Sequence, residues 1–337
     1  MKQDNPILIV TSCTRNYGWV TRAFLEGNTR WADYIVIVDQ MSTDATRLLI
    51  KDFQEKQGDG IHQAEIVIVD DPDMAYKENT RAKMGFMKGR ELAAGRDAIY
   101  FALDIDEVMP ANWQNTEDGK KILNSKQGDM FQLEWANIMP DGKAYTIGEW
   151  QYKVFHDNGM AWQDTKIQMH TPLLPYTDWN AEPTKVNDFP LLHFGEYNEK
   201  WIEYKTIYYQ FLDVQQNRSK NAISIYRMYH RCETKVENIQ QIRKEWLFDD
   251  VDLIEMVDTK GTPIFVQYIK DIIRKEGSKK YQAIDVWTDE LCREIGEKDL
   301  RSLGWRILHA YLRVTKPIAN SIIIRCIDKI LKKLNCW

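Results

Sequence analysis

The sequence predicts an α/β protein with a doubly wound, mainly parallel sheet, a mixed-sheet extension and an α-helical C-terminal region. Three observations point to this class. Up to residue 107, short runs that are apolar at nearly every position alternate with helical patterns, which is typical of parallel strands covered on both faces. From residue 128 to 195, apolar and polar residues alternate between turn signals. From residue 199 to 337, the pattern is mostly helical.

The apolar runs of the first part have the length of strands, and helical patterns connect them. The first helix ends at a Gly-Asn pair, and Ser42 or Thr43 is the expected N-cap of the second. In such a sheet, ligands bind outside the carboxyl ends of the strands. The predicted strands cover residues 6–13, 34–40, 64–71 and 97–104, and the predicted helices cover 17–28, 42–56 and 74–95.

The second part of the chain changes character. "DMFQLEWANIM" alternates before the turn "PDGK", and "WQYKVFHD" and "TKIQMHTPL" follow as further strand patterns. Breaks in the helical region are expected near Gly261–Pro263, Gly277 and Pro317. We expect one domain over residues 1–234, with halves at 1–107 and 108–234, and a helical C-terminal region over 235–337.

Composition excludes several classes of protein. The 337 residues are 44% hydrophobic, which is enough for one sizeable core. A formal net charge of -5 gives no reason to expect nucleic acid as a partner. The five cysteines are scattered without a CxxC pair, which indicates free thiols in a reducing compartment. No apolar run has the length of a signal peptide core or of the ~18 residues that span a bilayer. We therefore expect a cytoplasmic protein.

A cluster of carboxylates follows the fourth predicted strand. In "AIYFALDIDEVMPANW", residues 98–113, an apolar run ends in Asp104, Asp106 and Glu107. Clustered negative charge at the end of a buried strand requires a metal ion, a substrate, a basic side chain or water beside it. Asp104 and Asp106 point to one side of an extended chain, and paired carboxylates suit Mg²⁺ or Mn²⁺.

At this point the order of the motifs resembles a known family. "ILIVTSCTRN", "VIVDQMSTDAT", a middle helix with Arg81 and Lys83, and "AIYFALDIDEVM" are together similar to the nucleotide-sugar-binding half of family 2 glycosyltransferases, which have the GT-A fold. The likeness covers residues 5–110. It continues through "YKVFHDNGMAWQDTKIQMHTPL" and "LLHFGEYNEKWIEYK", which resemble lipopolysaccharide-core and capsule-type members.

The resemblance implies a function. The protein would be a hexosyltransferase that moves a sugar from a nucleoside-diphosphate donor, a UDP-sugar, to a glycan or lipid-linked acceptor. The reaction would invert the configuration at the anomeric carbon of the sugar. It would belong to surface polysaccharide or lipopolysaccharide synthesis. Mn²⁺ or Mg²⁺ would be the cofactor.

The resemblance also implies roles for particular residues. Asp106 would hold the divalent ion, Asp104 would reach the ribose or the metal, and His193 in "LLHFG" would take a late metal-ligand or diphosphate position. The other binding residues would be Thr11, Cys13 and Arg15 along the nucleotide, Asp39 at the base, Asp44 supporting that loop, and Arg81 and Lys83 near the diphosphate.

One motif departs from the family. Related chains often carry His-Glu where this one has His170-Thr171, so the carboxylate expected there is missing. An inverting transferase needs a general base for the acceptor hydroxyl. Asp164 is the first substitute, with Glu149 and Glu134 behind it.

Other functions remain open on the sequence. A haloacid-dehalogenase-type phosphatase also has a DxD motif after a strand, with the first Asp as nucleophile. A sugar-nucleotide pyrophosphorylase would need a Gly-rich basic loop, which "SCTRNYG" matches poorly. A non-catalytic GT-A domain that binds a nucleotide or glycan is the non-enzymatic alternative.

Two further features concern partners. Residues 301–337 hold eight Lys or Arg and one acid, Asp328, among large apolar residues. This basic amphipathic pattern indicates either a packed helix pair with a basic face or docking on an anionic inner membrane face. The aromatic residues that could line a sugar-acceptor groove are Trp150, Trp162, Tyr176 and Trp179.

Overall fold

The computed structural model describes residues 5–165, 173–175, 183–197, 199–215, 221–230, 239–258, 260 and 264–333. The chain forms two compact units. Unit 1 comprises Met1–Tyr197 and Asn238–Thr259, and unit 2 comprises Asn198–Glu237 and Lys260–Trp337. The chain thus leaves unit 1, returns to it and leaves again. The expected boundary between residues 234 and 235 concerns functional domains, and it stays a prediction.

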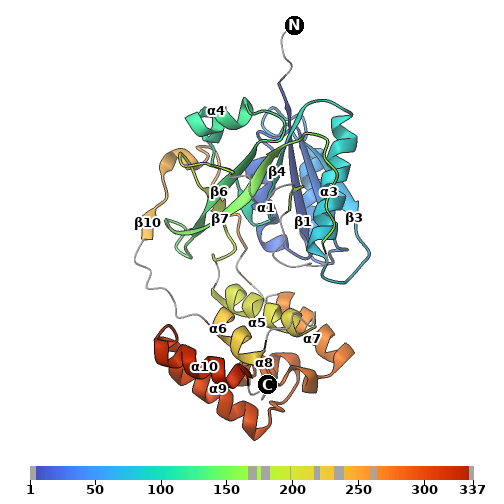
Figure 1. The fold of residues 1–337 in the computed structure, drawn as a ribbon. Coiled ribbons are helices and arrows are strands. Elements are labelled where there is room, and N and C mark those ends of the chain that lie inside the picture. The colour runs from blue at the N-terminus through green and yellow to red at the C-terminus, as the bar shows by residue number, and fades with distance from the viewer. Residues whose placement is uncertain are drawn as a thin grey trace. The chain divides into compact units, whose positions relative to one another are not determined.

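Unit 1 begins with four parallel strands, shown in Figure 1. These are β1 (Ile7–Thr14), β2 (Tyr34–Asp39), β3 (Glu65–Asp70) and β4 (Ala98–Ala102), and their order in the sheet is β3-β2-β1-β4. Because β1 lies between β2 and β4, the chain reverses its direction of winding there, and the helices fall on both faces.

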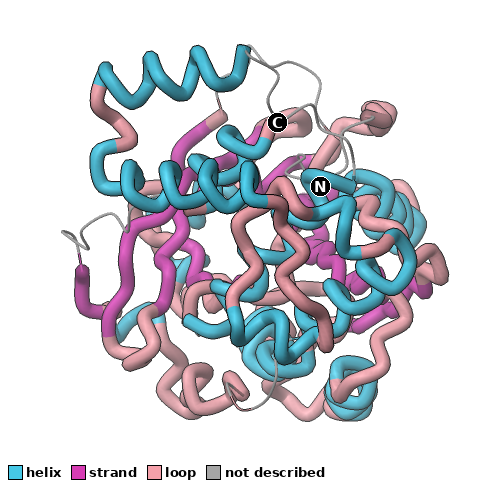
Figure 2. The backbone as a smooth tube through the Cα atoms, turned by 90° about the horizontal axis from the view of Figure 1, so that it is seen from below, coloured by secondary structure: helices cyan, strands magenta, loops and turns pink. Residues whose placement is uncertain are grey.

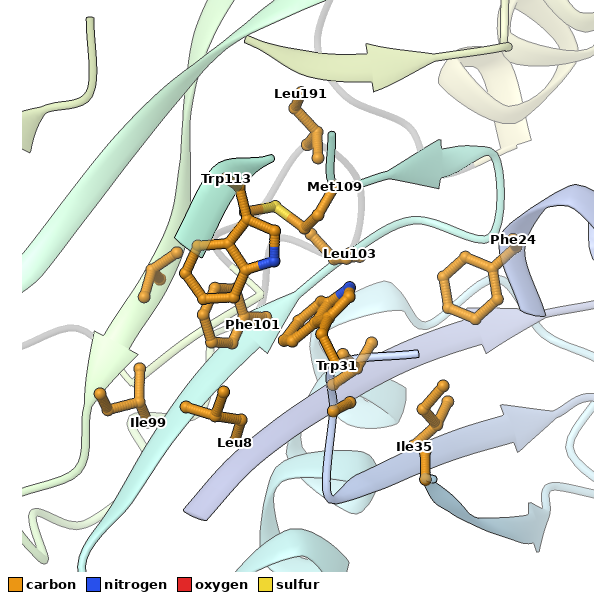
Figure 3. Close-up of a cluster of buried hydrophobic side chains, with 14 of the residues drawn as sticks. Leu8, Phe24, Trp31, Ile35, Ile99, Phe101, Leu103, Met109, Trp113 and Leu191 are labelled. Carbon is orange, nitrogen blue, oxygen red and sulfur yellow. The ribbon is translucent and has the colours of Figure 1, made fainter. Parts of the chain in front are cut away.

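The two faces of this sheet bury different side chains of the same strands. Leu8 and Val10 pack with helix α1 (Gly18–Asn28) and helix α2 (Thr46–Glu55) in a cluster centred on Trp31 and Trp113, shown in Figure 3. Ile7 and Ile9 pack with helix α3 (Glu78–Ala93) on the opposite face. This alternation along β1 confirms the predicted doubly wound α/β class.

The remaining strands extend this sheet as a mixed one. Strand β7 (Ala144–His156) pairs antiparallel with β4, and β6 (Met130–Ile138) pairs antiparallel with β7. The sheet continues through β9 (Leu191–His193) to β5 (Glu107–Val108). Two short strands pair off this path, β8 (Thr184–Lys185) on β6 and β10 (Ile239–Gln241) on β7. Helix α4 (Glu117–Leu123) and the 3₁₀ turns η1 (Trp113–Asn115) and η2 (Lys244–Trp246) complete unit 1.

Unit 2 is helical in the residues that the structure describes, and its helices are cyan in Figure 2. Ile223 and Tyr226 of α6 pack on Leu308 and Leu312 of α9. In the described part of the chain, no helix has both the length and the apolar character needed to cross a membrane. The elements of unit 2 are α5 (Glu199–Gln215), α6 (Ala222–Tyr229), α7 (Ile264–Glu276), η3 (Ser278–Tyr281), α8 (Asp289–Ile295), α9 (Leu303–Thr315), η4 (Lys316–Ile318) and α10 (Ile322–Lys333).

Two local predictions were wrong. Helix α2 begins at Thr46 after Ala45, not at Ser42 or Thr43, because the Ser42 hydroxyl is used by Asp39 instead. Residues 239–258 contain no α-helix. They contain β10, the 3₁₀ turn η2 and irregular chain, and residues 239–241 pair with the edge of β7. The predicted strand "TKIQMHTPL" falls largely outside the described residues, as do Tyr176, Trp179 and the break at Gly261–Pro263.

Candidate functional site

The carboxyl ends of the parallel strands bring the predicted acidic residues to one edge of the sheet. The register aligns Thr14 of β1 with Asp39 of β2, and Asp39 with Asp70 of β3. Asp104 follows β4, the neighbour of β1 on its other side. This edge is where open α/β sheets bind their ligands.

Hydrogen bonds join the loop after β1 to the loop after β2. The Asn16 side-chain carbonyl accepts from the Thr43 amide at 2.6 Å and from the Asp44 amide at 3.2 Å. The Asp44 carboxylate accepts from the amides of Gly18 and Thr46 at 2.9 and 3.0 Å. Asp44 thus links the two loops, and its role in a nucleotide site stays a prediction.

Asp39 is fully buried and already bound by the protein. Its Oδ1 accepts from the Ser42 hydroxyl at 2.5 Å, and its Oδ2 accepts from the Ser42 amide and from Arg47 at 3.0 and 2.7 Å. Arg47 also pairs with Asp70 at 2.7 Å. Contact between Asp39 and a nucleotide base would require Arg47 or Ser42 to move.

Arg81 of α3 lies at the end of β3. Its Nε donates to Asp71 at 2.7 Å, and both side chains are buried. Its Nη2 donates to the backbone carbonyls of Asp73 and Ala75. In this structure Arg81 holds the loop after β3. It also neighbours Cys13 on β1, where burial raises the pKa of the thiol to about 12 although Arg81 opposes this, so Cys13 is neutral.

Two of the three residues proposed as general bases, Asp164 and Glu149, face solvent, whereas Glu134 is half-buried. Asp164 accepts two hydrogen bonds from Lys83 at 3.0 Å, and 73% of its side chain is exposed. Glu149 is also exposed. The structure thus pairs two residues, Lys83 and Asp164, to which the sequence analysis gives separate roles. His170 and Thr171 lie outside the described residues.

A buried lysine neutralises two of the clustered carboxylates. Lys153 of β7 donates to Asp104 at 2.9 Å and lies 2.7 Å from Glu107, and only 4% of its side chain is exposed. Burial lowers the pKa of Lys153, but the charges of Asp104 and Glu107 outweigh this and raise it overall. Of the four possibilities that the sequence leaves open beside the cluster, a basic side chain is therefore present.

Glu107 is the most enclosed member of the cluster. Its side chain is fully buried, and it accepts from the Trp135 indole at 2.6 Å and from the Asp104 amide at 2.8 Å. Burial raises its pKa to about 8, with Lys153 opposing and Asp104 adding to the rise. Glu107 thus fixes the turn between β4 and β5 and has no path to a ligand.

Asp106 faces a different partner from the neighbouring carboxylates. Its Oδ2 lies 3.8 Å from Nε2 of His193, and both side chains are largely buried. The strands explain this meeting, because His193 of β9 pairs with Glu107 of β5 on one side and with Asn137 of β6 on the other. The Asp106 carbonyl also accepts from the Phe194 amide at 2.8 Å.

Two neighbours orient His193. The Asn137 side-chain oxygen lies 2.7 Å from Nδ1, and with the carbonyl in this position Nδ1 carries the proton. The lone pair is then on Nε2, the atom that faces Asp106, which is the tautomer a metal ligand requires. The Trp135 ring stacks on the imidazole at 4.5 Å and 13°.

The donor set beside Asp106 is small. Among the described residues, no three His, Cys, Asp or Glu side chains are grouped so that they could hold a metal ion. Asp106 and His193 supply one oxygen and one nitrogen donor. Two protein ligands are compatible with Mg²⁺ or Mn²⁺, which commonly keep water and take phosphate oxygens from a substrate.

Sequence reasoning missed Lys153, Trp135 and Asn137. All three lie on β6 or β7, where the alternating pattern predicts strands. A lysine between apolar neighbours, as in "QYKVFH", is the one signal that could have found Lys153, because a buried lysine requires a carboxylate partner.

Two solved structures resemble this chain distantly. No family model and no curated protein matches the chain. In structure the chain is similar to the Staphylococcus aureus protein TarS, residues 1–349, in complex with UDP, with a TM-score of 0.26, 15% identity, and coverage of 40% of this chain and 36% of that chain. The chain thus spans about a third of that structure. It is also similar to the mannosyltransferase PcManGT from Pyrobaculum calidifontis in complex with GDP-Man and Mn²⁺, with a TM-score of 0.39, 11% identity, and coverage of 96% and 84%. At these values no family is assigned, and the residues of the site carry the functional argument.

Proposed function

We propose that this protein is a metal-assisted, inverting glycosyltransferase of the GT-A type. It moves a hexose from a nucleoside-diphosphate donor, a UDP-sugar, to a glycan or lipid-linked acceptor of a surface polysaccharide or lipopolysaccharide. The observation that carries the proposal is the Asp106–His193 pair, whose oxygen and nitrogen donors lie 3.8 Å apart beside the carboxyl ends of a parallel sheet. The order of the sequence motifs, which resembles family 2, supports the donor class.

The residues near Asp106 fit a hard divalent cation. Asp106 and His193 would hold Mn²⁺ or Mg²⁺, with Asp104 beside them, and Asn137 keeps the His193 nitrogen available. When bound, the cation supplies positive charge for the diphosphate that leaves. Lys153 does not stabilise the leaving diphosphate in this proposal, because its ammonium group pairs with Asp104 and Glu107.

Other residues of the edge bind the donor in this proposal. Thr11, Cys13 and Arg15 follow the nucleotide, and the neutral Cys13 thiol adds no negative charge against the phosphates. The loop carrying Asp39 and Asp44 meets the base, while Arg81 and Lys83 lie on the diphosphate side. Asp164 or Glu149 takes the proton of the acceptor hydroxyl, which for Asp164 requires separation from Lys83.

Calorimetric titration of UDP and GDP, each with and without Mn²⁺, tests the proposal. We expect UDP to bind only when Mn²⁺ is present. Binding of GDP in place of UDP would change the donor and keep the reaction class. If neither nucleotide binds under either condition, the transferase proposal is wrong. If UDP binds but no UDP-sugar is hydrolysed or transferred, the chain is a binding domain without turnover.

Gly195 gives a variant that disturbs the cation site through its shape. A Cβ atom at this position would lie 2.4 Å from Nε2 of His193 and 2.9 Å from Oδ2 of Asp106. Gly195→Ala should therefore push these two groups apart and weaken Mn²⁺-dependent UDP binding about tenfold or more. Titration of the variant measures this. Gly304→Ala is the control, because its nearest neighbour is 3.9 Å away. Equal binding by both variants would contradict the assignment.

We also propose that helix α10 docks on an anionic membrane face. Ile323, Ile327 and Ile330 are spaced so that they share one side of the helix, and their exposed fractions are 72%, 37% and 59%. The opposite side buries Asp328, which pairs with Arg227 at 2.9 Å. The helix thus points its acidic side chain inward and its isoleucines outward. Arg325, Lys329, Lys332 and Lys333 accompany the apolar stripe, as in helices that lie on anionic lipid.

Pelleting with vesicles tests this docking. The whole chain should pellet with phosphatidylcholine vesicles that contain phosphatidylglycerol, and the triple variant Ile323→Ser, Ile327→Ser, Ile330→Ser should pellet at least about tenfold less. A triple serine variant of Leu48, Ile61 and Met74, which are exposed apolar residues of unit 1, is the control. If neither the whole chain nor the control pellets, and the α10 variant only abolishes a dimer, the stripe binds a second copy instead.

A further inference from the structure

Unit 1 contains a cavity that the proposed donor site does not use. Its volume is about 180 Å³, room for on the order of six water molecules and thus for a small ring, not a long chain. Strands β6 and β7, residues 186–190 and residues 240–246 line it. The last segment belongs to the part of the chain that returns to unit 1.

Aromatic side chains line the cavity together with polar groups. Trp135, Tyr145, Trp150 and Trp246 all line it. Tyr145 and Trp246 meet edge to face at 5.4 Å, and the Tyr145 hydroxyl donates to Gln240 of β10 at 2.6 Å. These contacts fix the planes of Tyr145 and Trp246 before any ligand arrives, and aromatic faces of this kind suit the C–H face of a sugar ring.

An irregularity between β6 and β7 directs a carboxylate to the same cavity. Glu134 pairs with Trp150, and the register then shifts before Ala136. This bulge brings the neighbouring residues Glu134 and Trp135 to the cavity together. Burial raises the pKa of Glu134, and Lys185 opposes the rise. A carboxylate that has lost part of its water gains from donors that a ligand supplies.

The charges of the cavity select the class of ligand. Glu134 and Asp188 contribute two negative charges, and Arg243 contributes one positive charge. Lys185, which acts on Glu134 and lies 4.9 Å from the centre of the Trp150 ring, adds a second positive charge. These four charges balance, so a ligand with a net charge of either sign gains little here. A neutral ring with several hydroxyl groups matches both the aromatic faces and the carboxylate, amide and guanidinium groups.

We propose that this cavity binds a neutral pyranose ring of the acceptor glycan, stacked on Trp150 and hydrogen-bonded to Glu134. The inference rests on the proposed function for the identity of the ligand as an acceptor. Trp135 connects the cavity to the donor site, because its ring stacks on His193 at 4.5 Å and its indole N–H donates to Glu107 at 2.6 Å. One indole ring therefore separates the acceptor cavity from the proposed cation ligand.

Saturation-transfer NMR on the whole chain tests the cavity without any donor. The probes are the methyl glycosides of glucose, galactose, mannose and N-acetylglucosamine. At least one should receive saturation, and Trp150→Ala and Glu134→Gln should each weaken its binding about tenfold. Leu48→Ala, an exposed change on α2, should leave the binding unchanged. Circular dichroism confirms that each variant is folded.

The outcome separates this inference from the proposed function. If no glycoside binds, or if binding survives both cavity variants, the cavity is not a sugar site. This conclusion holds whether or not UDP binds to the protein. If a glycoside binds through Trp150 and Glu134 while neither UDP nor GDP binds, the cavity assignment holds and the transferase proposal fails. Asp106→Asn should leave glycoside binding intact, because its carboxylate faces His193 and not the cavity.

Discussion

Replacing Lys153 by methionine is expected to lower the free energy of unfolding by about 3–5 kcal/mol. Lys153 is buried between Asp104 and Glu107, at 2.9 and 2.7 Å. Methionine keeps most of the volume and removes the charge. Asp104 then lacks its counter-charge. The buried Glu107 must either stay charged without a partner or take up a proton at a pH above its unfolded pKa, and both destabilise the folded state.

Urea unfolding at neutral pH measures this change. Lys83→Met is the matched control, because Lys83 forms an exposed pair with Asp164 and its loss should cost under about 1 kcal/mol. The double variant Lys153→Met, Glu107→Gln should recover part of the loss, because it removes the stranded charge. Equal unfolding free energies for Lys153→Met and Lys83→Met would show that the buried cluster does not depend on its lysine.

The loss should also depend on pH in a definite direction. Burial raises the pKa of Glu107 to about 8 in the natural chain even with Lys153 opposing, and removing Lys153 raises it further. A carboxyl whose pKa is higher in the folded state favours folding when protonated, so its contribution is present at low pH and is lost as pH rises through the folded pKa. The penalty of Lys153→Met should therefore be smaller at pH 5 than at pH 8. A penalty that grows toward pH 5 would contradict the assigned charges.

Asp106→Asn is expected to weaken Mn²⁺-dependent UDP binding by about a hundredfold or more while the fold persists. Asparagine keeps the shape but loses the anionic oxygen that a divalent ion requires. The negative charge of Asp106 contributes to the raised pKa of Glu107, so the two carboxylates repel each other. Its neutralisation therefore removes a repulsion and should not destabilise the protein.

Calorimetry with UDP and Mn²⁺, combined with urea unfolding, measures both effects. Asp271→Asn is the control, because it makes the same chemical change at an exposed pair with Arg274 in unit 2. Asn137→Ala should reduce binding about 10–100-fold, since it no longer fixes the His193 tautomer although both proposed metal ligands remain in the chain. Unchanged Mn²⁺ dependence in Asp106→Asn would exclude Asp106 as a ligand.

The parallel part of the sheet could be predicted because its signal is local. Each residue from Ile35 to Val38 is buried, so the sequence of β2 is apolar without interruption, and the helices between the strands have ordinary stop signals. The position of Asp39, Asp70 and Asp104 at one edge then follows from parallel topology alone. The fold class therefore needed no knowledge of distant contacts.

The partners of these carboxylates could not be predicted in the same way. Lys153 reaches Asp104 because β7 pairs with β4 so that Phe101 lies beside Val154, and nothing in either segment specifies this register. Asn137 meets His193 through a second pairing of the same kind. Residues 239–241 join β7 although their local pattern is polar, because a free strand edge, and not burial of side chains, determines their conformation.

The return of residues 238–259 to unit 1 has a consequence for biosynthesis. The strand edge at Ala144–Thr146 receives its partner β10 only after residues 157–238, which include the first segment of unit 2, have been translated. At a translation rate of about 5–20 residues per second, the nascent sheet waits for several seconds with an open edge. A chain released early, at residue 197 for example, would keep that edge and lose Trp246 from the cavity wall. Expression of this protein in halves should therefore yield aggregates. A rearranged gene in which residues 238–259 directly follow β7 should instead let the sheet form without the delay.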